Sequence, residues 1–216
     1  MKVIIFDLDG VLVDTENIHF ECLVEAINFV TGLPENKFVQ FVKSNGQTTT
    51  YKLNILKYEL TLSDFQIKLI DDRKQQNVIN RFNHIETSPD LYQMLTSLKM
   101  KYKLALASNS RKENVMRILN ILNITSFFSQ ILTNNDVRNH KPDPDIFLTI
   151  MEREHVLPNE TLILEDSIAG KYAAISSGAH LFPVDSIADV TLENIRDAIN
   201  KADNSSTDGR HGDKIY

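Results

Sequence analysis

An apolar run near the start of the chain constrains its fold more than any other segment. Val3-Ile4-Ile5-Phe6 is continuously apolar and leads directly into Asp7-Leu8-Asp9-Gly10. A run of this kind is typical of a fully buried parallel strand that delivers its acidic residues to the edge of a sheet. In α/β folds that edge borders the ligand crevice. The segment therefore predicts an α/β fold with Asp7 and Asp9 at its functional edge.

The two acidic residues also suggest a chemistry. Asp7 and Asp9 are two positions apart, so they share one side of the chain if the strand geometry continues. Two carboxylates held close together repel unless a cation or a proton intervenes. A divalent metal on Asp7 and a proton on Asp9 would make the pair a nucleophile beside a general acid/base. The alternative is a structural acidic turn, in which Gly10 only lets the backbone bend sharply.

The composition excludes several classes of protein. With 216 residues the chain can bury a sizeable core, as one large or two small domains. A net charge of -6 gives no basic surface for nucleic acid, and no apolar run approaches the length of a membrane span. Residues 2–6 are too short for a signal core, so we expect a cytoplasmic protein. The sequence leaves both a monomer and a weak dimer open. The single Cys22 lies in a helical apolar pattern and is expected in the core.

Residues 15–82 have the spacing of helices rather than strands. Their apolar residues recur every three or four positions, and Ser63-Asp64-Phe65-Gln66 has the spacing of a capping box. The predicted helices cover residues 15–32, 35–43, 48–60 and 63–82. We therefore expect a helical cap over residues 15–88, inserted after the first strand. Ser88-Pro89 would start the next helix in the N-cap and N1 positions.

From residue 89 onward, strands and helices alternate, which predicts a doubly wound, mostly parallel sheet with right-handed crossovers. The predicted strands cover residues 103–107, 130–133, 161–164 and 180–184, and the predicted helices cover residues 110–122, 144–155 and 168–177. Pro183 places the last strand at an edge, and Ser110 is expected to cap its helix. The core would comprise residues 1–14 and 89–202, and the polar residues 203–216 would form a flexible tail.

A polar cluster follows each of the next three strands. Ser108-Asn109 offers a hydroxyl near helix N-terminal amides, which suits phosphate oxygens. Lys141 could neutralise phosphoryl charge, although a lone lysine is usually a surface residue. Glu165-Asp166 follows another apolar run, and its hard oxygen ligands suit Mg²⁺, although two acids also stabilise a helix N-terminus. Because the carboxyl ends of parallel strands share one edge, these residues are expected to meet Asp7 there.

These clusters together resemble the motifs of the haloacid dehalogenase superfamily, in its phosphatase and phosphomutase branch. The first motif is Asp7-x-Asp9-Gly10-x-x-x-Asp14-Thr15, the second is Ser108, the third is Lys141, and the fourth runs from Glu165-Asp166 through Ala169-Gly170. The resemblance implies a catalytic set of Asp7, Asp9, Ser108 and Lys141. In it, Asp7 would be the nucleophile, and Asp9 would be the acid/base.

The resemblance also implies a Mg²⁺ site. Asp7 and Asp166 would bind the metal directly, Asp9 would offer its backbone carbonyl, and Glu165 would act directly or through a water. Asp9 speaks against a dehalogenase, because a departing halide needs no proton.

Substrate choice is expected to lie mainly in the cap. Asp14-Thr15-x-x-x-His19 resembles the β-phosphoglucomutase group, whose corresponding residues help cap closure and proton handling. Arg73 and Lys74 resemble phosphosugar contacts of that group, although both could simply be solvated. The expected substrate-binding residues are Thr15, His19, Gly46, Arg73, Lys74 and Asn109.

One departure from that group affects the predicted reaction. The mutases carry an arginine three residues after the cap-loop glycine, and Thr49 stands in that position after Gly46. A hydroxyl cannot replace a bidentate cation on a second phosphate. We therefore predict a Mg²⁺-dependent phosphatase acting on a small phosphorylated metabolite through an aspartyl-phosphate. A phosphosugar mutase is the first alternative, and a catalytically silent phosphoryl-binding module is the second.

Overall fold

The computed structural model describes residues 1–43, 47–82, 85 and 89–208. The strands in these residues are β1 (Val3–Phe6), β2 (Lys103–Ala107), β3 (Gln130–Leu132), β4 (Thr161–Glu165) and β5 (His180–Pro183). The α-helices are α1 (Glu16–Thr31), α2 (Val39–Val42), α3 (Thr49–Glu59), α4 (Asp64–Phe82), α5 (Pro89–Lys99), α6 (Lys112–Ile121), α7 (Asp145–Glu154), α8 (Ile168–Ser176) and α9 (Leu192–Asp208). Short 3-10 helices cover Glu35–Lys37, Thr125–Phe127, Pro158–Glu160 and Ile187–Asp189.

The strands form one parallel sheet in the order β3-β2-β1-β4-β5, so the predicted α/β class is confirmed. β1 is the central strand, and Phe6 at its end lies beside Leu106 on one side and Leu164 on the other. This register aligns the carboxyl ends of β1, β2 and β4. β5 is an edge strand, as Pro183 required.

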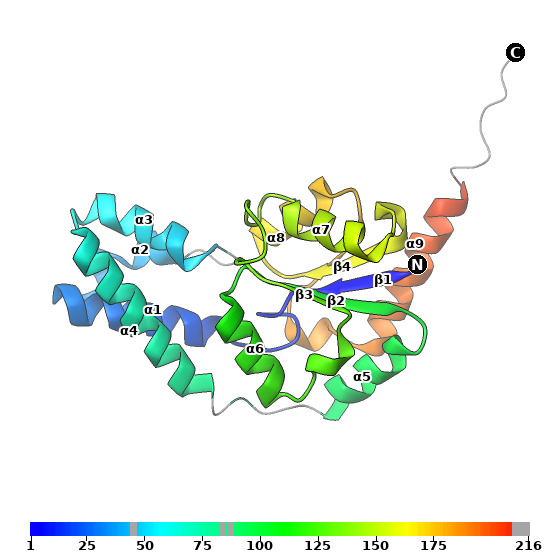
Figure 1. The fold of residues 1–216 in the computed structure, drawn as a ribbon, viewed down its shortest axis with the longest axis horizontal. Helices are drawn as coiled ribbons and strands as arrows, with labels where there is room; N and C mark the ends of the chain where they lie inside the picture. The colour runs from blue at the N-terminus through cyan, green and yellow to red at the C-terminus, as the bar shows by residue number, and fades with distance from the viewer. Residues whose placement is uncertain (44–46, 83–84, 86–88, 209–216) are drawn as a thin grey trace, which may run out of the picture.

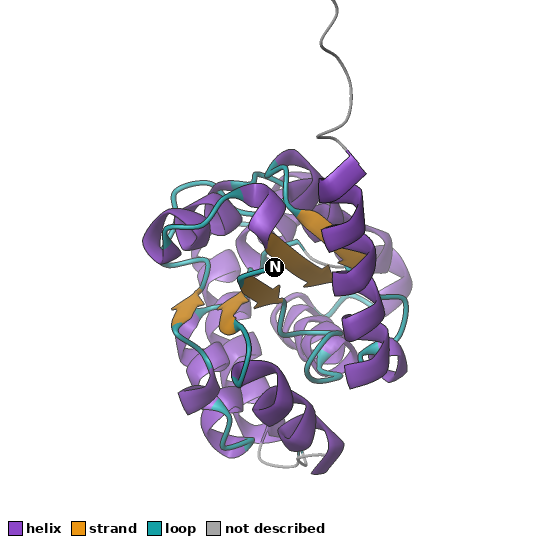
Figure 2. Ribbon diagram, turned by 90° about the vertical axis from the view of Figure 1, so that its right-hand side faces the viewer, coloured by secondary structure: helices purple, strands orange, loops and turns teal. Residues whose placement is uncertain are grey.

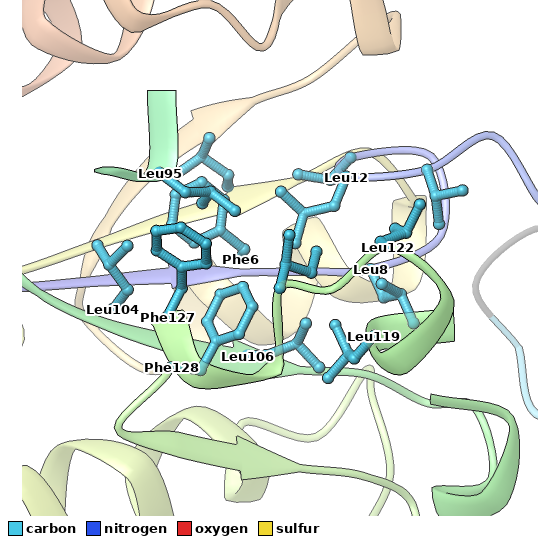
Figure 3. Packing of buried hydrophobic residues seen from close by; sticks show 14 of the residues in the cluster. Phe6, Leu8, Leu12, Leu95, Leu104, Leu106, Leu119, Leu122, Phe127 and Phe128 are labelled. Carbon is cyan, nitrogen blue, oxygen red and sulfur yellow. The ribbon is translucent and has the colours of Figure 1, made fainter. Parts of the chain in front are cut away.

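Helices cover both faces of the sheet, because alternate strand residues point to opposite sides (Figures 1 and 2). On one face, Phe6 and Leu106 pack with α5, α6 and α9, and Figure 3 shows Leu95 and Leu119 among their neighbours. On the other face, Ile5 packs with α7 and α8. This double winding fixes the strand ends from both sides, which is the condition for a rigid site at the edge.

The helices α1 to α4 lie between β1 and α5 in the sequence and form a separate group in space (Figure 1). They surround their own apolar cluster, in which Ile27 of α1, Leu56 of α3 and Ile70 of α4 are fully buried. The capping box predicted at Ser63 is present, since Ser63 N–H donates to Gln66 Oε1 and Gln66 N–H donates to Ser63 Oγ. Ser88, the predicted N-cap of α5, lies outside the described residues.

Three local predictions differ from the structure. The helix expected over residues 35–43 is divided into a 3-10 turn and the short α2. Ser110 does not cap α6, because Arg111 occupies the N-cap and the Ser110 hydroxyl donates to Asp9 instead. The flexible tail predicted over residues 203–216 is contradicted over residues 203–208, because α9 continues to Asp208 and Asp203 accepts a hydrogen bond from the Met1 amino group. Residues 209–216 lie outside the described residues. Cys22 is buried in α1, as predicted.

Within the described residues, no helix combines the length and the apolar character that crossing a membrane requires.

Candidate active site

Lys141 joins the ends of three strands. Its ammonium donates to Asp7 Oδ1 at 2.6 Å, to Glu165 Oε2 at 2.6 Å and to the Ala107 carbonyl at 2.8 Å. All three donors of the ammonium are thereby used, and the group is almost fully buried. Although burial alone would lower the pKa of Lys141, Asp7 and Glu165 raise it above its ordinary value. Lys141 is therefore a fixed positive charge against Asp7.

Three carboxylates meet beside this lysine. Asp7, Glu165 and Asp166 each offer an oxygen, and these oxygens lie within 4.8 Å of one another. Burial, followed by the charge of Glu165, raises the pKa of Asp166 to about 7. Burial, followed by the same neighbour, also raises the pKa of Asp7. One lysine cannot neutralise three acids, so the cluster has the charge and the oxygen donors that suit a divalent cation.

Two glycines make room for these acids. A Cβ built on Gly10 would overlap the Asp166 carboxylate, and one built on Gly170 would overlap the Glu165 carboxylate. Gly10 also has a φ of +80°, which side-chain-bearing residues rarely adopt. Glu165 is held further by Ser167, whose N–H and hydroxyl both donate to Glu165 Oε1. The acidic cluster is thus held by close packing as well as by Lys141.

Asp9 lies in a different environment from Asp7. The Thr15 hydroxyl donates to Asp9 Oδ1, the Ser110 hydroxyl donates to Oδ2 at 2.8 Å, and His19 Nε2 lies 3.5 Å from Oδ1. Burial would raise the pKa of Asp9, but His19, Thr15 and Ser110 together hold it well below its ordinary value. The observed arrangement therefore favours the ionised form of Asp9.

A buried lysine orients His19. Lys74 Nζ lies 3.2 Å from His19 Nδ1 and 3.0 Å from Thr49 Oγ1. An ammonium has no acceptor, so a charged Lys74 makes Nδ1 the acceptor and leaves the ring proton on Nε2, which faces Asp9. Burial lowers the pKa of Lys74 to about 8, and burial followed by the Lys74 charge lowers the pKa of His19. A neutral His19 with its proton directed at Asp9 is the result.

Ser108 and Asn109 support this geometry from the end of β2. Ser108 is buried, and its hydroxyl accepts a hydrogen bond from the Ser110 N–H at 3.0 Å. The Asn109 side chain donates to the Lys141 carbonyl and accepts from the Lys141 N–H, both at 3.1 Å. These bonds position Lys141 rather than leave Asn109 wholly available for a substrate.

The site opens into a cleft of about 670 Å³, counted with its mouth. The predicted residues that line it are Asp7, Asp9, His19, Ser108, Asn109, Lys141 and Asp166. Three further predicted residues do not line the cleft but contact a residue that does. Glu165 contacts Lys141, Thr15 contacts Asp9, and Lys74 contacts His19. Gly46 lies outside the described residues.

Arg73 is not brought to the cleft. Its guanidinium lies over the Phe29 ring, 3.8 Å from the centroid. Arg73 and Lys74 are consecutive on α4, so they point in directions about 100° apart, and only Lys74 points inward. The predicted substrate contact of Arg73 is therefore not supported by its position.

Several lining residues were not predicted as ligands. They are Glu16, Phe20, Val42, Gln47, Lys52, Ser110 and Ser167. Glu16, His19 and Phe20 share one face of α1 at helical spacing, so Glu16 and Phe20 could have been proposed once His19 was. Lys52 has no such signal, because its place depends on how α3 packs in the cap.

The chain is similar to known proteins in sequence and in structure. The family profile described as haloacid dehalogenase-like hydrolase matches residues 4–184. A phosphorylated carbohydrates phosphatase of Thermotoga maritima is 28% identical over 82% of this chain and 82% of its own length. A beta-phosphoglucomutase of Bacillus subtilis is 31% identical over 82% of this chain and 80% of its own length. Among solved structures, a beta-phosphoglucomutase from Clostridium difficile superposes with a TM-score of 0.77 at 26% identity, covering 93% of this chain and 98% of that one.

Proposed function

This chain belongs to the haloacid dehalogenase-like hydrolase family, and on that premise we propose that it is a Mg²⁺-dependent phosphatase of small phosphorylated metabolites, sugar phosphates first among them. The observation that carries the proposal is the position of Asp7. It is an acid at the end of the central strand, bound to Lys141 and adjacent to two further carboxylates. The similarity to a phosphatase of phosphorylated carbohydrates supports the choice of substrate class.

The acidic cluster fits a magnesium ion. Asp7 and Asp166 would hold it through carboxylate oxygens, Asp9 through its backbone carbonyl, and Glu165 would support it from behind while it remains bound to Lys141. When bound, Mg²⁺ would neutralise phosphoryl charge and so reduce the repulsion between a dianionic ester and the carboxylates. In the part of the chain that the structure describes, these three acids form the one such cluster.

The chain's own residues would carry the covalent steps. Asp7 would attack the phosphorus, forming an Asp7 oxygen–phosphorus bond as the bond from phosphorus to the leaving oxygen breaks. Asp9 would give its proton to that oxygen. In the second half, Asp9 would take a proton from a water that attacks phosphorus, and the Asp7 oxygen–phosphorus bond would break to release inorganic phosphate. Ser108 would bind a phosphoryl oxygen, and Lys141, whose donors are already in use, would hold Asp7 in place and offset phosphoryl charge.

Asp9 would have to exchange a proton in each half reaction. Its observed hydrogen bonds from Thr15 and Ser110, together with the Nε2 proton of His19, favour the ionised form that activates water. Thr15 is the N-cap of α1 and His19 lies in α1, the first helix of the cap, so a movement of the cap would change this environment and help Asp9 return to its protonated form. The acceptor that an ionised Asp9 deprotonates distinguishes the two reactions, because it is water in a phosphatase and a sugar hydroxyl in a mutase.

A mutase is the second candidate, because one relative carries that name. Thr49 stands where the mutase resemblance expects a cation, and its hydroxyl is already bound to Lys74. Because this position lacks the bidentate cation of the mutases, it favours hydrolysis over transfer to a second site on a phosphosugar.

The test is a screen of phosphate esters with the full-length protein, with and without Mg²⁺, and with a chelator as control. Mg²⁺-dependent release of phosphate from sugar phosphates is the expected result. β-Glucose 1-phosphate supplied with a bisphosphate primer separates the candidates, since glucose 6-phosphate formed faster than free phosphate would establish the mutase. No turnover of any ester would leave only a phosphoryl-binding role.

A further inference from the structure

The positively charged side chains around the cleft differ in whether their hydrogen-bond donors are already bound to other protein groups. Lys141 has all three occupied by Asp7, Glu165 and the Ala107 carbonyl. The Lys141 ammonium therefore contacts only groups at the strand ends, on the core side of the cleft, where the phosphoryl group would be attacked. An ammonium in this state has no donor left for another part of a substrate.

Other basic residues near the cap are also in use. Lys74 binds His19 and Thr49 and does not line the cleft. Arg73 lies over Phe29, and Arg111 forms an ion pair with Asp71. None of these three presents a free positive charge to the cleft.

Lys52 is different. It lies on α3, lines the cleft together with Gln47 and Phe20, and is partly buried. Its backbone N–H donates to the Thr48 carbonyl, but among the residues that the structure describes its ammonium has neither a hydrogen-bond nor an ion-pair partner. Burial lowers the pKa of Lys52, and Glu16, the acid that opposes this effect, is not within ion-pair distance. A half-buried ammonium without a counter-ion is unfavourable, so an anion placed beside it would be stabilised.

We propose that Lys52 binds a second negatively charged group of the substrate, a carboxylate or a second phosphate, on the leaving-group side of the scissile ester. The inference rests on the proposed phosphatase function and narrows its substrate class to esters whose alcohol carries its own anion. The core side of the cleft holds Asp7, Asp9 and Asp166, which would take the transferred phosphoryl group with Mg²⁺. Lys52 comes from the cap, which would cover the alcohol.

Two pairs of esters test this. Each pair differs only in the second anion. 2-Phosphoglycolate and 2-hydroxyethyl phosphate test a carboxylate, and β-glucose 1,6-bisphosphate and β-glucose 1-phosphate test a phosphate. The ratio of kcat/KM for the charged ester to that for the neutral ester is measured with Mg²⁺ in wild type, Lys52→Gln and Lys52→Arg. Lys57→Gln is the matched control, because Lys57 lies on the same helix and is bound to Asp64 at the surface.

In at least one pair, wild type should prefer the charged ester by about 10-fold or more, the size of one charge-assisted hydrogen bond. Lys52→Gln should remove that preference, Lys52→Arg should keep most of it, and Lys57→Gln should not change it. Equal loss on charged and neutral esters, or a wild type without preference in either pair, would overturn the inference.

Measuring ester binding separates the test of Lys52 from the test of the proposed phosphatase function. Calorimetric affinities for the same esters are measured in Asp7→Asn and in Asp7→Asn/Lys52→Gln. If wild type hydrolyses no ester, the proposed function fails, and the affinity ratios still decide the role of Lys52. A ratio unchanged by Lys52→Gln would refute that role whatever the turnover.

Discussion

The Lys141 ammonium lies 2.6 Å from the Asp7 carboxylate, although 134 positions of sequence separate the two residues. The parallel sheet brings them together, because Asp7 follows β1 and Lys141 reaches in below the end of β2. The contact gives the candidate nucleophile a fixed direction and a fixed counter-charge. A carboxylate held in this way loses little entropy when it attacks, which is one contribution that a rigid site can make to catalysis.

Replacing Lys141 with Met should destabilise the fold as well as abolish turnover. The variant leaves Asp7 and Glu165 buried without their cation, and breaking a buried pair of this kind costs about 3–5 kcal/mol. Urea unfolding in a chelator measures the loss, and added Mg²⁺ should recover part of it by binding the folded state. Lys2→Met is the control, because its ion pair with Glu160 is at the surface and is worth at most about 1 kcal/mol. Equal losses in the two variants would contradict the role given to Lys141.

The buried Lys74 should make stability depend on pH. Burial lowers its pKa from 10.5 to about 8, so between these values the unfolded chain binds more protons than the folded chain. The free energy of unfolding contributed by this site therefore rises with pH across that window, and the site is least favourable below pH 8. Relative to Lys74→Met, wild type should gain about 2–3 kcal/mol between pH 8 and pH 10.5.

Chemical unfolding of both proteins across this range measures the difference. Lys68→Met serves as control, because Lys68 is exposed on the same helix and its removal should give a difference that does not change with pH. A Lys74 difference that is flat, or that falls with pH, would show that Lys74 keeps its ordinary pKa in the folded protein.

Asp71 on α4 and Arg111 beside α6 form an ion pair between cap and core, and Gln75 and Asn114 form a hydrogen bond next to it. Removing the pair with Asp71→Ala should loosen α4 against the core and lower kcat/KM by up to about fivefold, the value of one partly exposed ion pair. Hydrogen exchange of α4 amides should increase. Asp72→Ala, at the exposed neighbouring position, should change neither quantity. Identical behaviour of the two variants would mean that the ion pair does not hold the cap.

The core side of the site could be predicted because each residue follows an apolar strand. In a parallel sheet, the strand ends meet, so Asp7, Ser108 and Asp166 needed only the strand assignments to be placed together. Lys141 follows a longer loop, and its place was predicted from the resemblance rather than from strand spacing. These residues do not depend on how helices are oriented.

The cap side depends on helix orientation, and there the sequence was less informative. Arg73 and Lys74 could not be distinguished until the buried face of α4 was known. Lys52 gave no signal, because α3 is polar on most of its surface. Ser110 has capping-box spacing, but its hydroxyl donates to the Asp9 carboxylate, a charge-assisted hydrogen bond, and Arg111 occupies the N-cap of α6. Residues 203–208 are polar and were expected to be flexible, yet α9 continues past the buried Ala202 to Asp208.

The most direct measurement is chemical trapping of a phosphorylated aspartate. The protein is mixed with Mg²⁺ and a turned-over ester, quenched during the steady state, treated with borohydride and examined by peptide mass spectrometry. We expect reduction of Asp7 to homoserine that depends on the ester and is absent in Asp7→Asn. It should be retained in Asp185→Asn, which changes an exposed carboxylate that is paired with Lys171 at the surface. Turnover with no modification of Asp7, or with modification of another carboxylate, would contradict the assignment of Asp7 as the nucleophile.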